Sequence, residues 1–86
     1  MREVRDSREK ELQIKDPLNI IFRQRGSNIV VYLKTGEKYT GILEKADTYM
    51  NLLLRNATED DGNKTTRYGR ALIRGNNILI IKVERL

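Results

Sequence analysis

The chain has 86 residues, of which 38% are hydrophobic and 6% aromatic, so we expect one small domain whose modest core gains from oligomerisation. It contains neither cysteine nor histidine, which excludes disulfide bonds and thiol chemistry and removes the commonest general base and metal ligand. Its net charge of +5 favours a polyanionic partner, and nucleic acid is the commonest of these.

Residues 1–16 form a segment in which basic and acidic side chains cancel. No apolar stripe runs through it, so we expect a mobile or marginally helical extension. The excess positive charge therefore lies in residues 17–86, which we predict to be the folded domain. No apolar run approaches the roughly 20 residues that span a bilayer, and the charged N-terminus lacks the apolar region of a signal peptide. We therefore expect a soluble, intracellular protein without a membrane partner.

A short helix is predicted from residue 17 to about residue 25. Asp16 is a good N-cap residue, and Pro17 suits the first helical position, where its missing N–H costs nothing. Gly26 can end the helix in a left-handed conformation. Three apolar residues recur at helical spacing: Leu18, Ile21 and Phe22. A helix of two turns is not stable alone, so its apolar side must lie against the rest of the domain.

Five strands follow, separated by tight turns. They are predicted at residues 28–34, 38–46, 50–59, 64–73 and 78–83. In the first, Ile29, Val31 and Leu33 share one face. Gly41, in the middle of the second, marks a bend or a close backbone approach, as at a barrel corner. The pattern predicts a mainly β fold, a small and strongly bent antiparallel barrel of five strands with a short N-terminal α-helix.

The last predicted strand has no polar face, because residues 78–81 are all aliphatic. Both of its sides need cover, and an exposed hydrophobic edge strand would aggregate unless another strand paired with it. Pairing between subunits solves this problem, and head-to-tail pairing that closes on itself makes a ring.

Two groups of residues in this order and spacing resemble the two sequence motifs of the Sm and Sm-like (LSm) proteins, most closely those of the archaeal type. The first comprises Val31, Leu33, Gly36, Gly41, Leu43, Asp47, Met50, Asn51 and Leu54, and the second Gly69, Ile73, Arg74, Gly75 and Ile78. With the helix, the resemblance covers about residues 17–83. It implies the SH3-like barrel of the Sm fold and rings, usually of seven subunits, in which the fourth strand of one subunit pairs with the fifth of the next. It also implies binding of single-stranded, uridine-rich RNA around the pore.

The resemblance further implies an RNA-binding site made by two loops that lie side by side at the pore. Tyr49 would stack on one face of a base, Arg74 would cover the other face, and Asn51 would read the base edge through its amide. Asp47 would orient the first loop by accepting backbone N–H groups. The second loop continues with Gly75 and with Asn76, which stands where many members have Asp; this change bears on uracil selectivity more than on RNA binding.

Ordinary interpretations stand beside these roles. Taken singly, Tyr49 is more often a half-packed loop residue, Asn51 a turn residue and Arg74 a solvated side chain; together and in register they indicate a pocket. Tyr39 and Tyr68 are assigned to strand faces or interfaces. Asp60 and Asp61 indicate a polar hairpin rather than a metal site. Three basic residues can add phosphate attraction without forming a site: Lys38, Lys45 and Arg55.

We therefore expect a ring subunit that binds uridine-rich RNA and serves as a chaperone or scaffold in RNA processing or turnover. The alternative is a structural subunit of a ribonucleoprotein that acts through protein partners, with residues 1–15 as its docking element. The residue types present argue against an enzyme, and no cofactor or metal is expected. A homoheptamer is favoured, and a mixed Sm/LSm ring stays open. The location would be cytoplasmic in an archaeon, and nuclear or cytoplasmic in a eukaryote.

Overall fold

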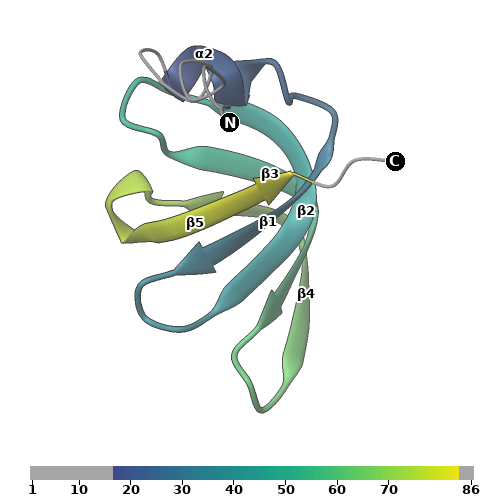
Figure 1. The fold of residues 1–86 in the computed structure, drawn as a ribbon. Helices are drawn as coiled ribbons and strands as arrows, with labels where there is room; N and C mark the ends of the chain where they lie inside the picture. Colours follow the sequence, from purple (N-terminus) through teal and green to yellow (C-terminus); the bar gives the residue numbers. More distant parts are fainter. Residues whose placement is uncertain (1–16, 84–86) are drawn as a thin grey trace, which may run out of the picture.

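The computed structural model describes residues 17–83. In this range the chain forms a short α-helix and then five strands of a single sheet, with a 3-10 helix between the last two strands (Figure 1). The elements in chain order are α2 (Pro17–Phe22), β1 (Asn28–Leu33), β2 (Lys38–Ala46), β3 (Leu52–Asp60), β4 (Thr65–Ile73), η1 (Gly75–Asn77) and β5 (Ile78–Val83). The strands pair antiparallel in the order β4-β3-β2-β1-β5, which confirms the predicted fold class. The predicted extension, residues 1–16, lies outside the described residues.

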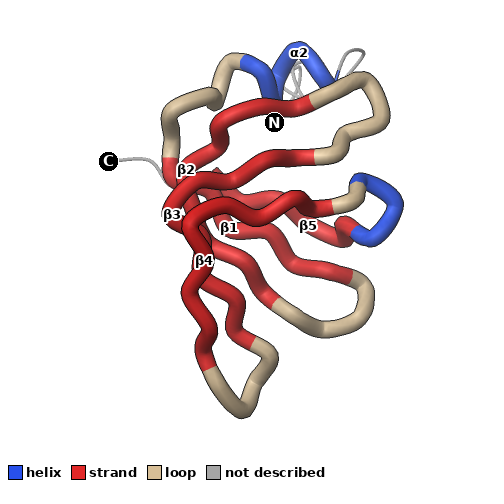
Figure 2. The backbone as a smooth tube through the Cα atoms, turned by 180° about the vertical axis from the view of Figure 1, so that it is seen from behind, coloured by secondary structure: helices blue, strands red, loops and turns tan. Residues whose placement is uncertain are grey.

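The sheet is strongly bent, and the bend is centred on β2, β3 and β4 (Figure 2). Gly41 is buried in β2, and a Cβ atom there would lie 3.1 Å from the Arg55 carbonyl oxygen and 3.2 Å from the Leu54 Cβ. The β2–β3 register shifts by one residue beside it, and Asn56 in β3 has a φ of 53°. The glycine therefore allows the close backbone approach that the sequence predicts, where a β-bulge bends the sheet.

The core lies inside this bend. Ile29 and Val31 of β1 are completely buried, as predicted, while Leu33 packs partly buried against them. The other buried apolar residues come from α2 and from β2, β3 and β4: Ile21, Leu43, Leu52, Leu54, Ala57 and Ile73. Burying each of the larger side chains contributes about 1.5–3 kcal/mol, so α2 is held by Ile21 rather than by its own hydrogen bonds.

The predicted end of the helix, near residue 25, is wrong, because α2 ends at Phe22. The N–H groups of Gln24 and Arg25 bond to carbonyls three residues back, those of Ile21 and Phe22, at 2.9 and 3.2 Å. Gly26 then takes a φ of 87° and donates its N–H to the Leu43 carbonyl at 2.8 Å. The tighter turns replace the last helical turn because the chain has to dock onto β2 at this point.

The two outermost strands, β4 and β5, are the edges of the sheet. Predicted and observed bounds agree for β2 and β5 and differ by one or two residues for the others. Both edges carry exposed apolar side chains: 65% of Leu72 and 41% of Tyr68 on β4, and 62% of Leu79 and 50% of Ile80 on β5 are accessible. The single chain thus leaves β5 uncovered, and this is the strand for which the sequence predicts pairing with another subunit. Within residues 17–83, no helix has the length and apolarity to cross a membrane.

Candidate nucleic-acid interface

Two loops that are distant in sequence meet at one side of the molecule. Both views place the segment between β2 and β3 next to η1 (Figures 1 and 2), and the Gly75 N–H donates to Asn51 Oδ1 at 2.7 Å. A Cβ atom at Gly75 would lie 2.1 Å from the Tyr49 carbonyl oxygen and 2.9 Å from the Met50 carbonyl. Only glycine therefore lets the two backbones approach this closely.

Asp47 organises the first loop. One carboxylate oxygen accepts the backbone N–H groups of Tyr49 and Asn51, each at 2.9 Å, and the other accepts the Asn51 side-chain amide at 2.9 Å. The Asn51 side-chain hydrogen bond is the largest cause that lowers the pKa of Asp47, followed by the Asn51 backbone N–H. These bonds hold Met50 at a φ of 65°, a left-handed conformation that non-glycine residues adopt at a cost. The geometry matches the orienting role expected for Asp47.

The Asn51 side chain bridges the two loops. Its Nδ2 donates to Asp47 and its Oδ1 accepts from Gly75. Because a carboxylate only accepts and an N–H only donates, these partners allow a single orientation of the amide. With respect to residues 17–83, one N–H of Nδ2 and one lone pair of Oδ1 remain for a ligand. Sequence reasoning assigned Asn51 to base recognition alone and missed this second, structural duty.

The two loops enclose an open pocket of about 540 Å³, which we call the loop pocket; it is lined by Tyr49, Met50, Asn51, Arg74, Gly75 and Asn76. Tyr49 is 79% exposed, so its ring is free to stack. Arg74 is exposed at the start of η1 and makes no side-chain hydrogen bond or ion pair with residues 17–83. Five of the six predicted site residues line this pocket, and Asp47 supports it from within the first loop. Met50 was not predicted, although it stands between two residues that were.

The remaining candidates lie elsewhere. Tyr39 and Tyr68 are on strands next to Glu59, to which the Tyr68 hydroxyl donates at 2.8 Å. Burial first, then the Glu59 charge, raises the pKa of Tyr39. Asp60 and Asp61 accept backbone N–H groups of their own hairpin at 2.9–3.0 Å. In the described part of the chain, no three His, Cys, Asp or Glu residues form a group that could hold a metal ion. The hydrogen bonds of Asp60 and Asp61 confirm the predicted polar hairpin.

An exposed tyrosine, an exposed arginine and an asparagine amide thus line one open pocket, and flat exposed groups of this kind suit contact with an unpaired base. Residues 19–83 match the LSM domain. The chain therefore belongs to the LSM domain family.

Two relatives support membership of this family. The chain is 43% identical over 70 residues to the "LSM complex subunit lsm4" of Schizosaccharomyces pombe, a match that covers 79% of this chain and 58% of that protein. It is 35% identical over 70 residues to a "Putative snRNP Sm-like protein" of Thermoplasma acidophilum, covering 80% of this chain and 84% of the relative. The similarity thus spans somewhat more than half of the yeast protein and most of the archaeal one.

Solved structures show the same fold. The Sm protein of Pyrococcus abyssi, determined in complex with a uridine heptamer, superposes with a TM-score of 0.75 at 32% identity, covering 81% of this chain and all of that one. A heptameric archaeal Sm protein superposes with a TM-score of 0.71 at 28% identity, covering 78% and 98% of the two chains.

Proposed function

We propose that this protein is a subunit of a ring that binds single-stranded, uridine-rich RNA at its pore and acts as a chaperone or scaffold in RNA processing or turnover. The observation that carries the proposal is the Asn51 amide, held in one orientation by Asp47 and Gly75 in a pocket that an exposed Tyr49 and an exposed Arg74 also line. The uridine heptamer bound to the similar Pyrococcus protein supports it. This function is one of binding and involves no catalysis.

Base binding follows from the two flat groups of the loop pocket. The Tyr49 ring stacks on one face of a base and the Arg74 guanidinium covers the other. Only an unpaired base exposes both faces, so the target is single-stranded. Stacking on an aromatic ring contributes about 1–3 kcal/mol per base, and an arginine plane adds a cation–π contribution.

Uracil preference follows from the locked amide. The free N–H of Asn51 Nδ2 can donate to uracil O4, and the free lone pair of Oδ1 can accept from uracil N3–H. Cytosine would instead place its 4-amino group, a donor, against the Nδ2 donor, and its unprotonated N3, an acceptor, against the Oδ1 acceptor. Rotating the amide to suit cytosine would break its bonds to Asp47 and Gly75 and leave both partners unsatisfied. Asn76, which stands where many members have Asp, offers a neutral amide beside this site.

Ring assembly follows from the edges of the sheet. In the ring that we propose, β4 of one copy pairs with β5 of the next, so that Leu72 and Tyr68 on one edge are covered together with Leu79 and Ile80 on the other. The heptameric archaeal relative supports seven subunits. A homoheptamer is our first proposal, with a mixed ring as its alternative. The ring would act inside the cell, in the cytoplasm of an archaeon or in the nucleus or cytoplasm of a eukaryote.

The test is to measure uridine-heptamer and cytidine-heptamer binding to the purified chain by fluorescence anisotropy, with native mass spectrometry to count the subunits. We expect a seven-subunit ring that prefers the uridine heptamer. In Tyr49→Ala, affinity should fall by tenfold or more, since about 1–3 kcal/mol of stacking is lost per base. The matched control is Thr48→Ala, an exposed neighbour that does not line the pocket. Equal affinity for the two heptamers would refute the uridine assignment, and a chain that stays monomeric would refute the ring.

A further inference from the structure

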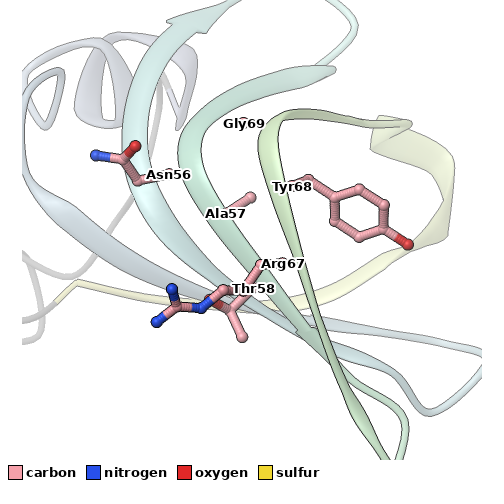
Figure 3. A pocket seen from close by; sticks show the side chains of 6 residues that line it. All are labelled: Asn56, Ala57, Thr58, Arg67, Tyr68 and Gly69. Atoms are coloured by element: carbon pink, nitrogen blue, oxygen red, sulfur yellow. The ribbon is translucent and has the colours of Figure 1, made fainter.

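A second hollow lies at the bend of β3 and β4. It has a volume of about 410 Å³ and is lined by Asn56, Ala57, Thr58, Arg67, Tyr68 and Gly69 (Figure 3). None of these residues lines the loop pocket. Gly69 contributes no side chain, and a Cβ atom there would meet nothing within 4 Å. The hollow is therefore open space over the strands, not a site of close packing.

The polar residues of this hollow face outward. Ala57 is 1% exposed and belongs to the core, so its neighbour Thr58 points to the other side of the strand. Thr58 is directly opposite Arg67, and the two side chains share that outer face. Figure 3 shows Arg67 and Thr58 together, while Tyr68 points the opposite way. Asn56, at the bulge, is exposed.

Three arginines mark this outer face, and we call Arg55, Arg67 and Arg70 the arginine face. Arg55 lies directly opposite Arg70, and like charges in that position repel each other. Arg70 is paired with Glu44, with Nε to Oε1 at 3.0 Å and Nη2 to Oε2 at 3.2 Å. Arg55 and Arg67 make no side-chain hydrogen bond or ion pair with residues 17–83. Two exposed guanidinium groups, those of Arg55 and Arg67, therefore remain available, and an anion bound at Arg55 would also offset its repulsion from Arg70.

We propose that the arginine face binds backbone phosphates of RNA that continues beyond the pore. Arginine, threonine and asparagine are side chains that contact phosphate and sugar oxygens, and all three surround the hollow. The aromatic ring of Tyr68 is turned to the other face, so phosphates rather than stacked bases fit here. A strand added at the β4 edge would lie in the plane of the sheet and leave this face open. The inference rests on the proposed RNA-binding function.

The experiment compares three labelled RNAs: a uridine heptamer, the same heptamer extended by a tail of adenines and cytosines, and the tail alone. They are titrated against the unmodified 86-residue chain and against the double variant Arg55→Ala/Arg67→Ala. We expect the heptamer to bind both proteins within about twofold, since this variant leaves the loop pocket intact. The extended RNA should bind the variant several-fold more weakly, and the salt dependence of its affinity should flatten by about 1.4 in log–log slope, or about 0.7 for each lost phosphate contact.

The matched control is Arg23→Ala/Arg25→Ala, which removes the same charge from two exposed arginines that follow α2. It should bind the extended RNA as the unmodified protein does. Arg55→Lys/Arg67→Lys, which retains both charges, should recover most of the loss. Circular dichroism and native mass spectrometry check that every variant keeps its fold and assembly.

Two results would overturn the proposal. One is an unchanged affinity and salt slope for the extended RNA in Arg55→Ala/Arg67→Ala. The other is an equal loss in the Arg23→Ala/Arg25→Ala control, which would indicate an effect of net charge alone. If the heptamer fails to bind, the proposed uridine pocket is wrong, but the tail alone still tests the arginine face: its binding and its loss in the first variant support the inference, and its failure to bind refutes it.

Discussion

The side-chain oxygen of Asn51 lies 2.7 Å from the backbone nitrogen of Gly75, which comes 24 residues later in the chain. This hydrogen bond ties the loop before β3 to the 3-10 helix before β5. It also holds the Asn51 amide in the orientation set by Asp47. The loop pocket therefore depends on one contact that each loop alone could not make.

Gly75→Ala should separate the two loops, because the new methyl group would lie 2.1 Å from the Tyr49 carbonyl oxygen. We expect the free energy of unfolding to fall by about 1–3 kcal/mol, as for overpacking, and uridine-heptamer affinity to fall by more than tenfold. Chemical denaturation and anisotropy measure the two effects. For stability, the matched control is Gly69→Ala, where the methyl group meets nothing and the change should stay within about 1 kcal/mol. Full uridine affinity in Gly75→Ala would contradict this account of the loop contact.

Asp47→Asn should reduce selectivity between bases. The new amide nitrogen cannot accept a hydrogen bond from Asn51 Nδ2, so the bond at 2.9 Å is lost and the Asn51 amide can rotate more freely. We expect the ratio of uridine-heptamer to cytidine-heptamer affinity to fall toward one. Asp61→Asn is the control, because it removes the same charge from a hairpin carboxylate that, within residues 17–83, bonds only to its own turn. A ratio that stays unchanged in Asp47→Asn would show that the carboxylate does not orient the amide.

Low pH should weaken uridine binding at the loop pocket. Hydrogen bonds from the Asn51 amide and backbone lower the pKa of Asp47 below its ordinary value of 3.8. A carboxylate whose pKa is lowered stabilises the folded loop fully at any pH above its ordinary pKa. This stabilisation is lost as the pH falls through the lowered pKa. Since the chain has no histidine, uridine affinity should hold steady from neutral pH down to about pH 5 and decline only below about pH 4. Anisotropy across this range is the measurement, and a decline already near pH 6 would contradict the prediction.

Leu79→Lys should break the proposed ring without unfolding the subunit. Leu79 is 62% exposed on the β5 edge. The free energy of unfolding of the single chain should therefore change by no more than about 0.5 kcal/mol, as for most surface substitutions. A lysine on an edge strand blocks strand pairing. We expect monomers by native mass spectrometry, and a large loss of affinity for uridine-rich RNA because the pockets no longer act together. Ile20→Lys on α2, which is 45% exposed, controls for an added surface charge. A Leu79→Lys protein that still forms complete rings would rule out the β5 edge as the contact.

The strands and turns of this protein were predictable because the signals are local. Alternation of apolar residues placed Ile29 and Val31 on the buried face, and the mid-strand position of Gly41 indicated the bend where its Cβ would crowd Leu54. The end of the helix was not predictable. Gly26 placed the predicted end near residue 25, but the helix already ends at Phe22, where the chain turns so that the Gly26 N–H can bond to Leu43 of β2. No local sequence pattern indicates that distant carbonyl.

The residue types of the loop pocket were also readable along the chain, since Tyr49, Asn51 and Arg74 stand in a recurring order and spacing. Their joint geometry was not. The locked amide of Asn51, the left-handed Met50 and the steric need for glycine at position 75 all arise where two separate backbones touch. Likewise, Arg55 and Arg70 become neighbours only through the register of β3 with β4. Composition and periodicity set which segments become strands, because that choice depends on neighbours along the chain. The arrangement of donors and acceptors came from tertiary contact, because hydrogen bonds and charge repulsion act across space between residues that the sequence keeps apart.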